Sequence, residues 1–355
     1  MLFWNQEARP AHPGGPNKRQ GVTKTMREYH GFTGCGSFYK GNLHSHTTIS
    51  DGMLTPEQNV AQYKEHGYHF LCMSEHDIFT DHRAQFNTEN FIVLPGVEAT
   101  AVLYRAIGTS ERYKLHHMHG ILGTTEMQQN APEGTFGHLQ YLPPIKFFGQ
   151  WEGAKAAQQL SDMLRAHGCV VTYNHPVWSR VLDEEFMDTT GVTALEIFNY
   201  NSTNEAAVGS GLVHWDRMLR AGKRINGFAS DDNHNEGLFD DACGGWICVQ
   251  AESLTHDAIV ENFMKGNYYS SAGPEIYDWG VKDGRVWIDC SRVERVNFVA
   301  GNIVNDGGTV IGELRKDTLT HAEHTLKGHE SYVRVEVVDR FGRAAWTNPI
   351  YLEWD

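Results

Sequence analysis

Two histidines, His44 and His46, follow a short apolar stretch, and Asp51 comes shortly after them on a Ser-Asp-Gly turn. Alternate side chains of an extended strand point to the same face, so both imidazoles can reach one cation. Neutral imidazoles and a carboxylate are good ligands for a transition metal. Histidine pairs with this spacing also occur on surface strands. The stretch therefore predicts a metal site only if distant parts of the chain supply further ligands.

Side chains of the ligand type recur where predicted strands end. Short apolar runs are typical of buried parallel strands, and they occur at residues 70–73, 91–94, 169–173, 194–198 and 225–229. Between and around them the sequence predicts helices, at residues 56–66, 154–167, 212–221 and 255–265. This alternation implies a parallel sheet with helical crossovers. In a closed barrel of this kind the strand ends converge at one mouth. The candidate metal ligands there are His44, His46, Asp51, His76, Glu98, His119, His175, Asp232 and His234.

Each of these residues also has an ordinary structural interpretation. His175, before Pro176, could be a packing residue, and Glu98 could pair with an arginine. The nine groups together are harder to explain without cations, because carboxylates sharing one rim would repel one another and lose hydration. Nine ligands can hold more than one divalent ion, since each ion needs only three or four of them.

The order and spacing of these motifs resemble the PHP family, the polymerase and histidinol phosphatase family of metal-dependent phosphoesterases. The resemblance runs from residue 41 to residue 276. Its motifs are His44-Ser45-His46 with Ser50-Asp51-Gly52, Ser74-Glu75-His76-Asp77, Pro95-Gly96-Val97-Glu98, Asn174-His175-Pro176 and Asp232-Asn233-His234. Two more stretches look like the carbaryl-hydrolase-like branch of that family: His214-Trp215-Asp216-Arg217 and residues 266–274.

The resemblance implies an α/β fold, a distorted (β/α)7 barrel that often carries a trinuclear centre. The first metal would be held by His44, His46, Glu98 and Asp232. Glu98, as a bridge, would hold the second metal with His119 and His175, and Asp51, His76 and His234 would hold the third. His119 is preferred to His116 and His117 because the stretch at residues 119–123 best fits the family motif. Asp51 is a departure, since many family members have histidine there.

The chemistry expected of such a centre is hydrolysis. Two cations bridged by Glu98 would lower the pKa of a shared water and present hydroxide as the nucleophile. We assign catalytic roles to Glu98, Asp232 and His234. Arg180 is a candidate phosphate-binding residue, with a solvent-facing loop arginine as the alternative interpretation. The cofactors would be two or three divalent ions of zinc, manganese or iron.

Three functions compete at this point. Hydrolysis of a small phosphomonoester or phosphodiester leads. A carboxyl-ester, carbamate or amide hydrolase could use the same hydroxide, and the branch resemblance motivates this alternative. A non-catalytic metal-binding scaffold is the third.

The chain of 355 residues is expected to contain one large domain and one small one. Residues 1–37 are interpreted as an irregular, proline- and glycine-rich lead-in, and residues 38–274 as the metal-dependent barrel. Residues 124–150 interrupt the barrel pattern and predict either a lid or an ordinary surface excursion. Residues 275–355 favour β-branched residues in alternation and predict a small antiparallel β-domain of the sandwich type.

Composition limits the partners and the compartment. The chain has 44 acidic and 30 basic residues and a formal net charge of -14, which argues against an extended nucleic-acid surface but not against a small phosphorylated substrate. The six cysteines are scattered without a Cys-x-x-Cys motif, and no secretory signal or membrane-spanning stretch is apparent. These features favour a cytoplasmic protein that acts on a small molecule.

Overall fold

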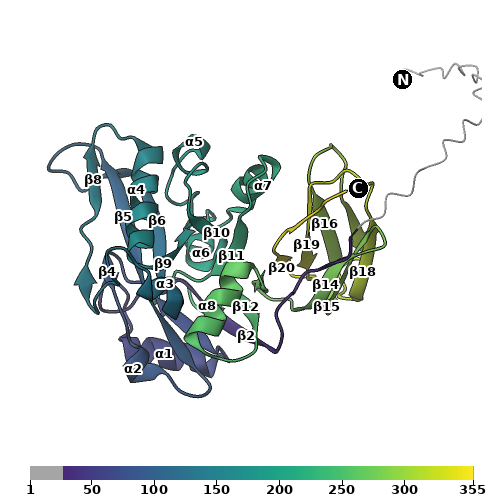
Figure 1. Cartoon of the computed structure of the whole chain (residues 1–355), viewed down its shortest axis with the longest axis horizontal. Helices are drawn as coiled ribbons and strands as arrows, with labels where there is room; N and C mark the ends of the chain where they lie inside the picture. Colours follow the sequence, from purple (N-terminus) through teal and green to yellow (C-terminus); the bar gives the residue numbers. More distant parts are fainter. Residues whose placement is uncertain (1–26, 355) are drawn as a thin grey trace, which may run out of the picture.

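The computed structural model describes residues 27–354. It has a larger α/β part and a smaller part made only of strands, which lie at opposite ends of the molecule in Figure 1. This agrees with the expected division into a large and a small unit.

Seven strands of the α/β part carry the predicted ligands or lie between them. In their hydrogen-bonded order they are β2 (Ser37–Asn42), β3 (Phe70–Met73), β5 (Ile92–Tyr104), β6 (Arg112–Leu122), β9 (Cys169–Tyr173), β10 (Val192–Asn199) and β11 (Asn226–Ser230). Neighbours pair in parallel except at β6, which is antiparallel to both β5 and β9. The prediction of an all-parallel sheet is therefore wrong at β6. The segment between Tyr104 and Arg112 is too short for a helical crossover, so the chain turns back as a hairpin.

The two ends of this run of seven strands meet at the carboxyl end of the sheet. An isolated parallel bridge joins Ser45, after β2, to Asn233, after β11. The backbone N–H of His46 donates to the carbonyl of Asn233 at 3.1 Å, and that of Asp232 donates to the carbonyl of His44 at 2.9 Å. Stretches that are almost 190 residues apart in the sequence are thus held side by side by backbone hydrogen bonds.

The helices begin and end close to the predicted positions. At the start of α1 (Pro56–Glu65), the Thr55 side chain accepts from the N–H of Gln58, and the Gln58 side chain accepts from the N–H of Thr55. This reciprocal pair satisfies two of the N–H groups that a helix start leaves unpaired. The other long helices are α4 (Gly153–Ala166), α7 (Leu212–Arg220) and α8 (His256–Lys265). Four are short: α2 (Arg83–Phe86), α3 (Thr125–Gln129), α5 (Asp183–Phe186) and α6 (Tyr200–Ala206).

Residues 124–150 are packed structure rather than one long loop. After α3, strand β7 (Gln140–Tyr141) pairs with β4 (Ile78–Phe79), and β8 (Ile145–Phe148) extends the sheet beside β5. Phe136 and Leu142 are buried in the core of the α/β part. Strand pairing therefore anchors the segment to β4 and β5.

The smaller part consists of two antiparallel layers around a core of valine, isoleucine and tryptophan. One layer contains β1 (Tyr29–His30), β14 (Ile276–Lys282), β15 (Arg285–Val293) and β18 (Leu319–Thr325). The other contains β16 (Arg295–Ala300), β17 (Gly308–Ile311), β19 (Tyr332–Val338), β20 (Ala344–Thr347) and β21 (Ile350–Tyr351). Strand β1 falls within the predicted irregular lead-in, because it pairs with the edge strand β14; residues 1–26 of that lead-in lie outside the described residues.

The two parts share one continuous sheet. Strand β12 (Trp246–Ala251) pairs with β2, β13 (Tyr268–Ser271) pairs with β12, and β20 pairs with β13. In Figure 1, β20 accordingly lies on the side of the smaller part that faces the α/β part. None of the six cysteines forms a disulfide, and four of them are buried. Among the described residues, no helix has the length and apolar character needed to cross a membrane.

Candidate metal centre

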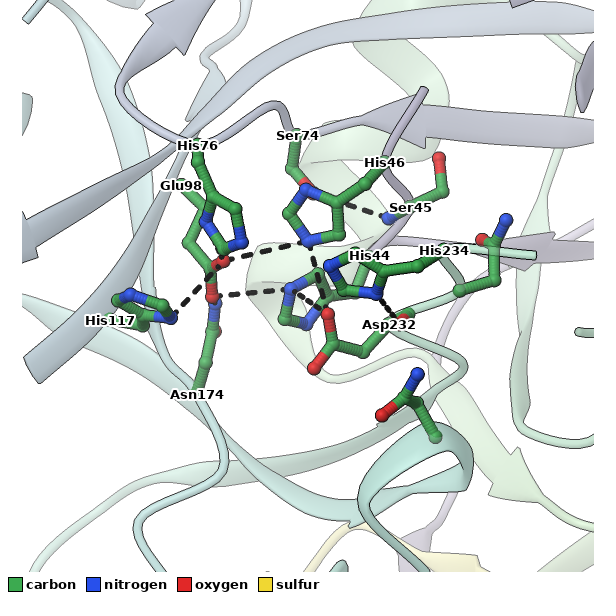
Figure 2. Close-up of polar contacts among 12 residues, drawn as sticks. His44, Ser45, His46, Ser74, His76, Glu98, His117, Asn174, Asp232 and His234 are labelled. Carbon is green, nitrogen blue, oxygen red and sulfur yellow. Dashed lines mark hydrogen bonds and ion pairs between the residues drawn. The ribbon is translucent and has the colours of Figure 1, made fainter. Parts of the chain in front are cut away.

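The first predicted ligand set comes together at the end of the sheet where β2 and β11 meet. His44, His46, Glu98 and Asp232 are buried, and each offers a ligand atom within 4.8 Å of the others. The Nε2 atoms of His44 and His46 each lie 3.0 Å from Asp232 Oδ1 (Figure 2). The strand closure between Ser45 and Asn233 explains this proximity, because it sets Asp232 beside the two histidines.

The backbone at two of the predicted ligands is in a conformation that non-glycine residues rarely adopt. Asp232 has a φ of 58° and His175 a φ of 21°. Such conformations cost free energy and persist where the surrounding structure holds them, which is frequent at functional sites.

A buried glutamate that the sequence prediction missed orients His44. Glu196, on β10, lies with its Oε1 2.9 Å from His44 Nδ1, and its Oε2 accepts from the N–H of His175 at 2.8 Å and from Asn199 Nδ2 at 3.0 Å. When His44 Nδ1 carries the proton, its Nε2 faces Asp232 as a free ligand atom. A lone acidic residue within the apolar run at residues 194–198 was the available signal, since buried glutamates are almost always paired.

Replacing this glutamate tests its orienting role. We expect Glu196→Gln to weaken metal binding by about 10- to 100-fold, because partners of this kind fix the tautomer and basicity of a ligand histidine. Metal titration of the refolded or chelator-treated protein measures this loss. Unchanged affinity in a folded variant would show that Glu196 has only a packing role.

Glu98 is the hub of the site. Both of its oxygens are buried, and five histidine nitrogens lie within 4.0 Å of them. The side-chain amide of Asn174 donates to Glu98 Oε1 at 2.7 Å and fixes the carboxylate (Figure 2). The five histidines are His44, His46, His76, His117 and His175.

The structure brings His117, rather than the predicted His119, to this hub. His117 Nδ1 lies 3.3 Å from Glu98 Oε2, and the two form a possible ligand group with His76. His119 is buried, its Nδ1 contacts Thr172 Oγ1 at 3.2 Å, and its ring packs edge-on against His44. Both side chains point to the same face of β6, but the strand runs antiparallel to β5, so His117 lies nearer the mouth. The family-motif argument for His119 had no access to this strand direction.

The third predicted set also comes together, with one addition. Asp51 Oδ2 lies 3.4 Å from His76 Nε2, and Asp51 Oδ1 lies 3.5 Å from His234 Nε2. His46 joins these three in one group. The Asp51 side chain is 56% exposed, whereas Glu98 is fully buried. This group therefore forms the solvent-facing rim of the site.

Loss of the rim carboxylate is expected to remove one metal and leave the others. We expect Asp51→Ala to lower the bound metal by about one ion per chain, because exposed ligands bind a cation less tightly than buried ones. Elemental analysis after dialysis measures this, with Asp51→His as the matched control that restores a ligand. An unchanged metal content in Asp51→Ala would exclude Asp51 as a ligand.

The pKa values of the histidines at the site are shifted in two opposite directions. Burial lowers the pKa of His46 to about 3, with repulsion from His76 and His234 adding to the effect, and burial lowers the pKa of His117 to about 4. Burial alone would raise the pKa of Glu98, but His117 and His44 hold it well below its usual range. The neighbouring carboxylates act the other way on the remaining contacts of Glu98. Against the effect of burial, they raise the pKa of His44 and His175 and raise that of His76 to about 9. A cation bound at these nitrogens would have to displace their protons.

Several buried polar atoms at the centre have no hydrogen-bond partner. They include His44 Nε2, His76 Nδ1, His117 Nδ1 and Glu98 Oε2, which belong to residues of the groups that could hold a cation; the others are His46 Nδ1 and the Nε2 of His119. Buried groups of this kind are normally paired, because an unpaired one costs free energy. The first four of these atoms face one another and match the ligand preferences of divalent transition metals. The residues present therefore fit a centre of divalent ions.

Arg180 is not among the residues that the structure brings to the metal ligands. It is exposed, with a φ of 61°, and it lines a separate pocket of about 260 Å³ with Arg112 and Lys114. Trp178 lies between that pocket and the one beside Asp51 and His234. The predicted contact between Arg180 and a phosphate at the metals is not supported by this placement.

Among the solved structures that resemble the chain are two bacterial proteins. One, from Bacteroides vulgatus, is described as a two-domain protein containing a predicted PHP-like metal-dependent phosphoesterase; it is 14% identical, with a TM-score of 0.41, over 92% of this chain and 98% of that one. The other, from Bifidobacterium adolescentis, is described as a candidate metal-dependent phosphoesterase; it is 16% identical, with a TM-score of 0.37, over 63% of this chain and 95% of that one.

No family model matches the chain, and no curated protein matches it. Neither structural description mentions carbaryl hydrolases, so that part of the sequence resemblance stays a prediction. Likenesses this distant do not establish an activity, which has to be argued from the side chains of the site.

Proposed function

We propose that the chain is a PHP-type metal-dependent phosphoesterase that hydrolyses a small phosphomonoester or phosphodiester. The observation that carries this proposal is the shared position of Glu98, a buried carboxylate within 4.0 Å of five histidines. A carboxylate has two oxygens and could bind two ions at once. A carboxylate that contacts several histidines is therefore suited to a multinuclear centre.

The proposed ligand sets follow the geometry. His44, His46, Glu98 and Asp232 would hold one ion, and Asp51, His76 and His234 the rim ion, with His46 adjoining both groups. Glu98 would hold a further ion with His117 and His175, with His119 as the alternative that the motif favours. Zinc, manganese and iron all suit this mixture of imidazole and carboxylate. Bound ions of this kind activate a water molecule and stabilise the charge on phosphoryl oxygens.

Other polar residues of the chain hold the proposed ligands in place for this reaction. Glu196 and Asn174 orient His44 and Glu98, and Asn199 Nδ2 donates to Asp232 Oδ2 at 3.0 Å. In the hydrolysis, the oxygen of water bonds to phosphorus, the ester P–O bond breaks, and the leaving oxygen gains a proton. The proton that the attacking water loses passes through solvent in the open pocket to the leaving oxygen. His234 lines that pocket and its Nε2 faces Asp51, so we assign it the positioning of the rim ion beside the leaving group.

The fold proposal goes with this function. We infer that β2, β3, β5, β6, β9, β10 and β11 form the distorted (β/α)7 barrel of the PHP type, with residues 38–274 as its domain and residues 275–355 as the β-domain. The bridge between Ser45 and Asn233 supports this proposal, because it links the first and last of the seven strands.

A metal-reconstituted protein and a substrate panel test the proposal. The protein, loaded in turn with zinc, manganese and iron, is expected to release phosphate or alcohol from small phosphomonoesters or phosphodiesters, and chelation is expected to abolish the release. Aryl carbamates and carboxyl esters in the same panel test the alternative hydrolase chemistry. Turnover of those compounds alone would replace the phosphoesterase proposal, and a fully metallated protein inert to the whole panel would favour the metal-binding scaffold.

A further inference from the structure

A pocket of about 270 Å³ opens beside the rim group, and Asp51 and His234 form part of its wall. Trp178, Leu238 and Phe239 supply apolar surface. Glu205, Glu236 and Asp241 add carboxylates, and Asn201 completes the lining. Counting the residues that the structure describes, no lysine or arginine lines this pocket.

Trp178 connects the pocket to the metal ligands. Its ring packs edge-on against His175, with the centroids 5.1 Å apart, and lies 6.1 Å from the ring of His117. Its indole N–H donates to Glu205 Oε2 at 2.8 Å, so the ring is held from the side of α6. A group attached to a phosphorus at the metal centre would meet this indole face as it extends into the pocket.

The carboxylates of the pocket differ in what they can do. Asp241 is buried and accepts from the backbone N–H groups of His234 and Asn235, so it shapes the loop. Glu205 and Glu236 are exposed and can meet a ligand charge directly.

Basic side chains line a neighbouring pocket instead. Arg112 and Arg180 line the neighbouring pocket, which Trp178 and Glu205 separate from this one. An anionic group that extends beyond the rim ion into this pocket would therefore meet the carboxylates of Glu205 and Glu236, with no lysine or arginine of the lining to compensate them.

We propose that this pocket holds the leaving group of the substrate, and that Glu205 and Glu236 select leaving groups with an apolar face and no negative charge. The inference rests on the proposed function, which it deepens by defining the substrate class. Aryl or alkyl phosphoesters with neutral or cationic leaving groups fit this pocket. Bisphosphates, polynucleotides and esters of carboxylate-bearing alcohols are disfavoured, because their second anionic group faces Glu205 and Glu236.

Phosphonates test the pocket without turnover, because their P–C bond is not hydrolysed. Binding of phenylphosphonate, its 4-aminomethyl derivative and its 4-carboxy derivative to the metal-loaded full chain is measured by calorimetry. We expect the cationic compound to bind most tightly and the anionic one to bind most weakly, with roughly a threefold change for each exposed carboxylate that acts on the charge.

Charge-neutral variants assign the effect to the two glutamates. Glu205→Gln keeps an acceptor for the Trp178 indole while it removes the charge, and Glu236→Gln removes the other charge. Each is expected to narrow the difference between the cationic and anionic phosphonates, and the double variant to abolish it. Glu89→Gln, at an exposed glutamate outside the pocket, is the matched control and should leave the order unchanged.

Any of four results would overturn the inference. The three phosphonates could bind equally, the anionic one could bind most tightly, none could bind, or the double variant could keep the order of the unsubstituted protein. The corresponding aryl phosphates separate it from the proposed function. If the phosphonate order holds but no aryl phosphate is hydrolysed, the proposed function fails and the pocket assignment stands. If all three phosphates are hydrolysed without preference, and the phosphonates bind equally, the proposed function stands and the pocket assignment fails.

Discussion

Replacing Glu98 by alanine is expected to lower turnover by at least about 1,000-fold and to remove most of the bound metal, because the substitution deletes the one carboxylate shared by five histidines. The fold should survive. Among the described residues, Asn174 is the side chain that donates through its amide to Glu98, and one unpaired donor costs about 1–3 kcal/mol. Elemental analysis, steady-state kinetics and thermal unfolding measure the three effects.

Glu98→Gln is the matched control for packing. Its amide keeps the volume of the side chain and an acceptor for Asn174, but it lacks the charge that binds cations. We expect it to unfold at a temperature close to that of the unsubstituted protein and still to lose metal and turnover. Full activity in either variant would reject Glu98 as a ligand and, with it, the proposed centre.

The variants His117→Ala and His119→Ala are expected to show which of the two histidines binds a metal: His117, which contacts Glu98, or His119, which the motif predicted. His117→Ala should lose bound metal and about 100-fold in turnover, because its Nδ1 lies 3.3 Å from Glu98. His119→Ala should lower the unfolding temperature, since it leaves a cavity beside the buried His44 ring, and it should keep most of the metal.

His119→Asn serves as a conservative control, because its short amide can still contact Thr172. Metal content, measured beside the unfolding temperature for each variant, distinguishes a ligand from a packing residue. Loss of metal in His119→Ala together with full retention in His117→Ala would restore His119 as the ligand.

Much of the α/β part could be predicted from local pattern. The apolar runs at residues 70–73 and 169–173 coincide with β3 and β9, and the signals around Thr55 and Pro56 give the start of α1 within a residue. These elements are set by short-range chemistry: buried runs bounded by turns, and a side chain that caps a helix start.

The β5–β6 hairpin was missed because the periodicity of residues does not encode the direction of a strand. Residues 91–94 predicted a short strand, yet β5 extends to Tyr104, and β6 returns beside it after a segment too short for a helix. Because the sequence pattern does not give the direction of β6, it also favoured His119 over His117. Which of two histidines on one strand lies nearer the mouth depends on the direction of that strand.

The rest of the predicted centre was inferred from the types of its residues, which the sequence shows directly. Eight of the nine predicted ligands fall within the groups that could hold a cation. Seven of them follow a strand of one sheet, and Glu98 follows the apolar run at residues 91–94. Glu196 was overlooked for the opposite reason. It lies in the middle of its strand, and only the burial of β10 shows that its carboxylate must serve neighbouring groups.

The continuous sheet that runs through β12, β13 and β20 bears on how the molecule can move. Many two-domain enzymes close over a substrate by hinge rotation, which needs a linker that few hydrogen bonds cross. Here a ladder joins Tyr269 to Thr347 and Ser271 to Ala345, and rotation of the β-part would break it. We therefore expect the two parts to move as one rigid body. Any gating of the active site would then come from the short loops that carry Trp178 and Phe239, on a timescale faster than domain closure.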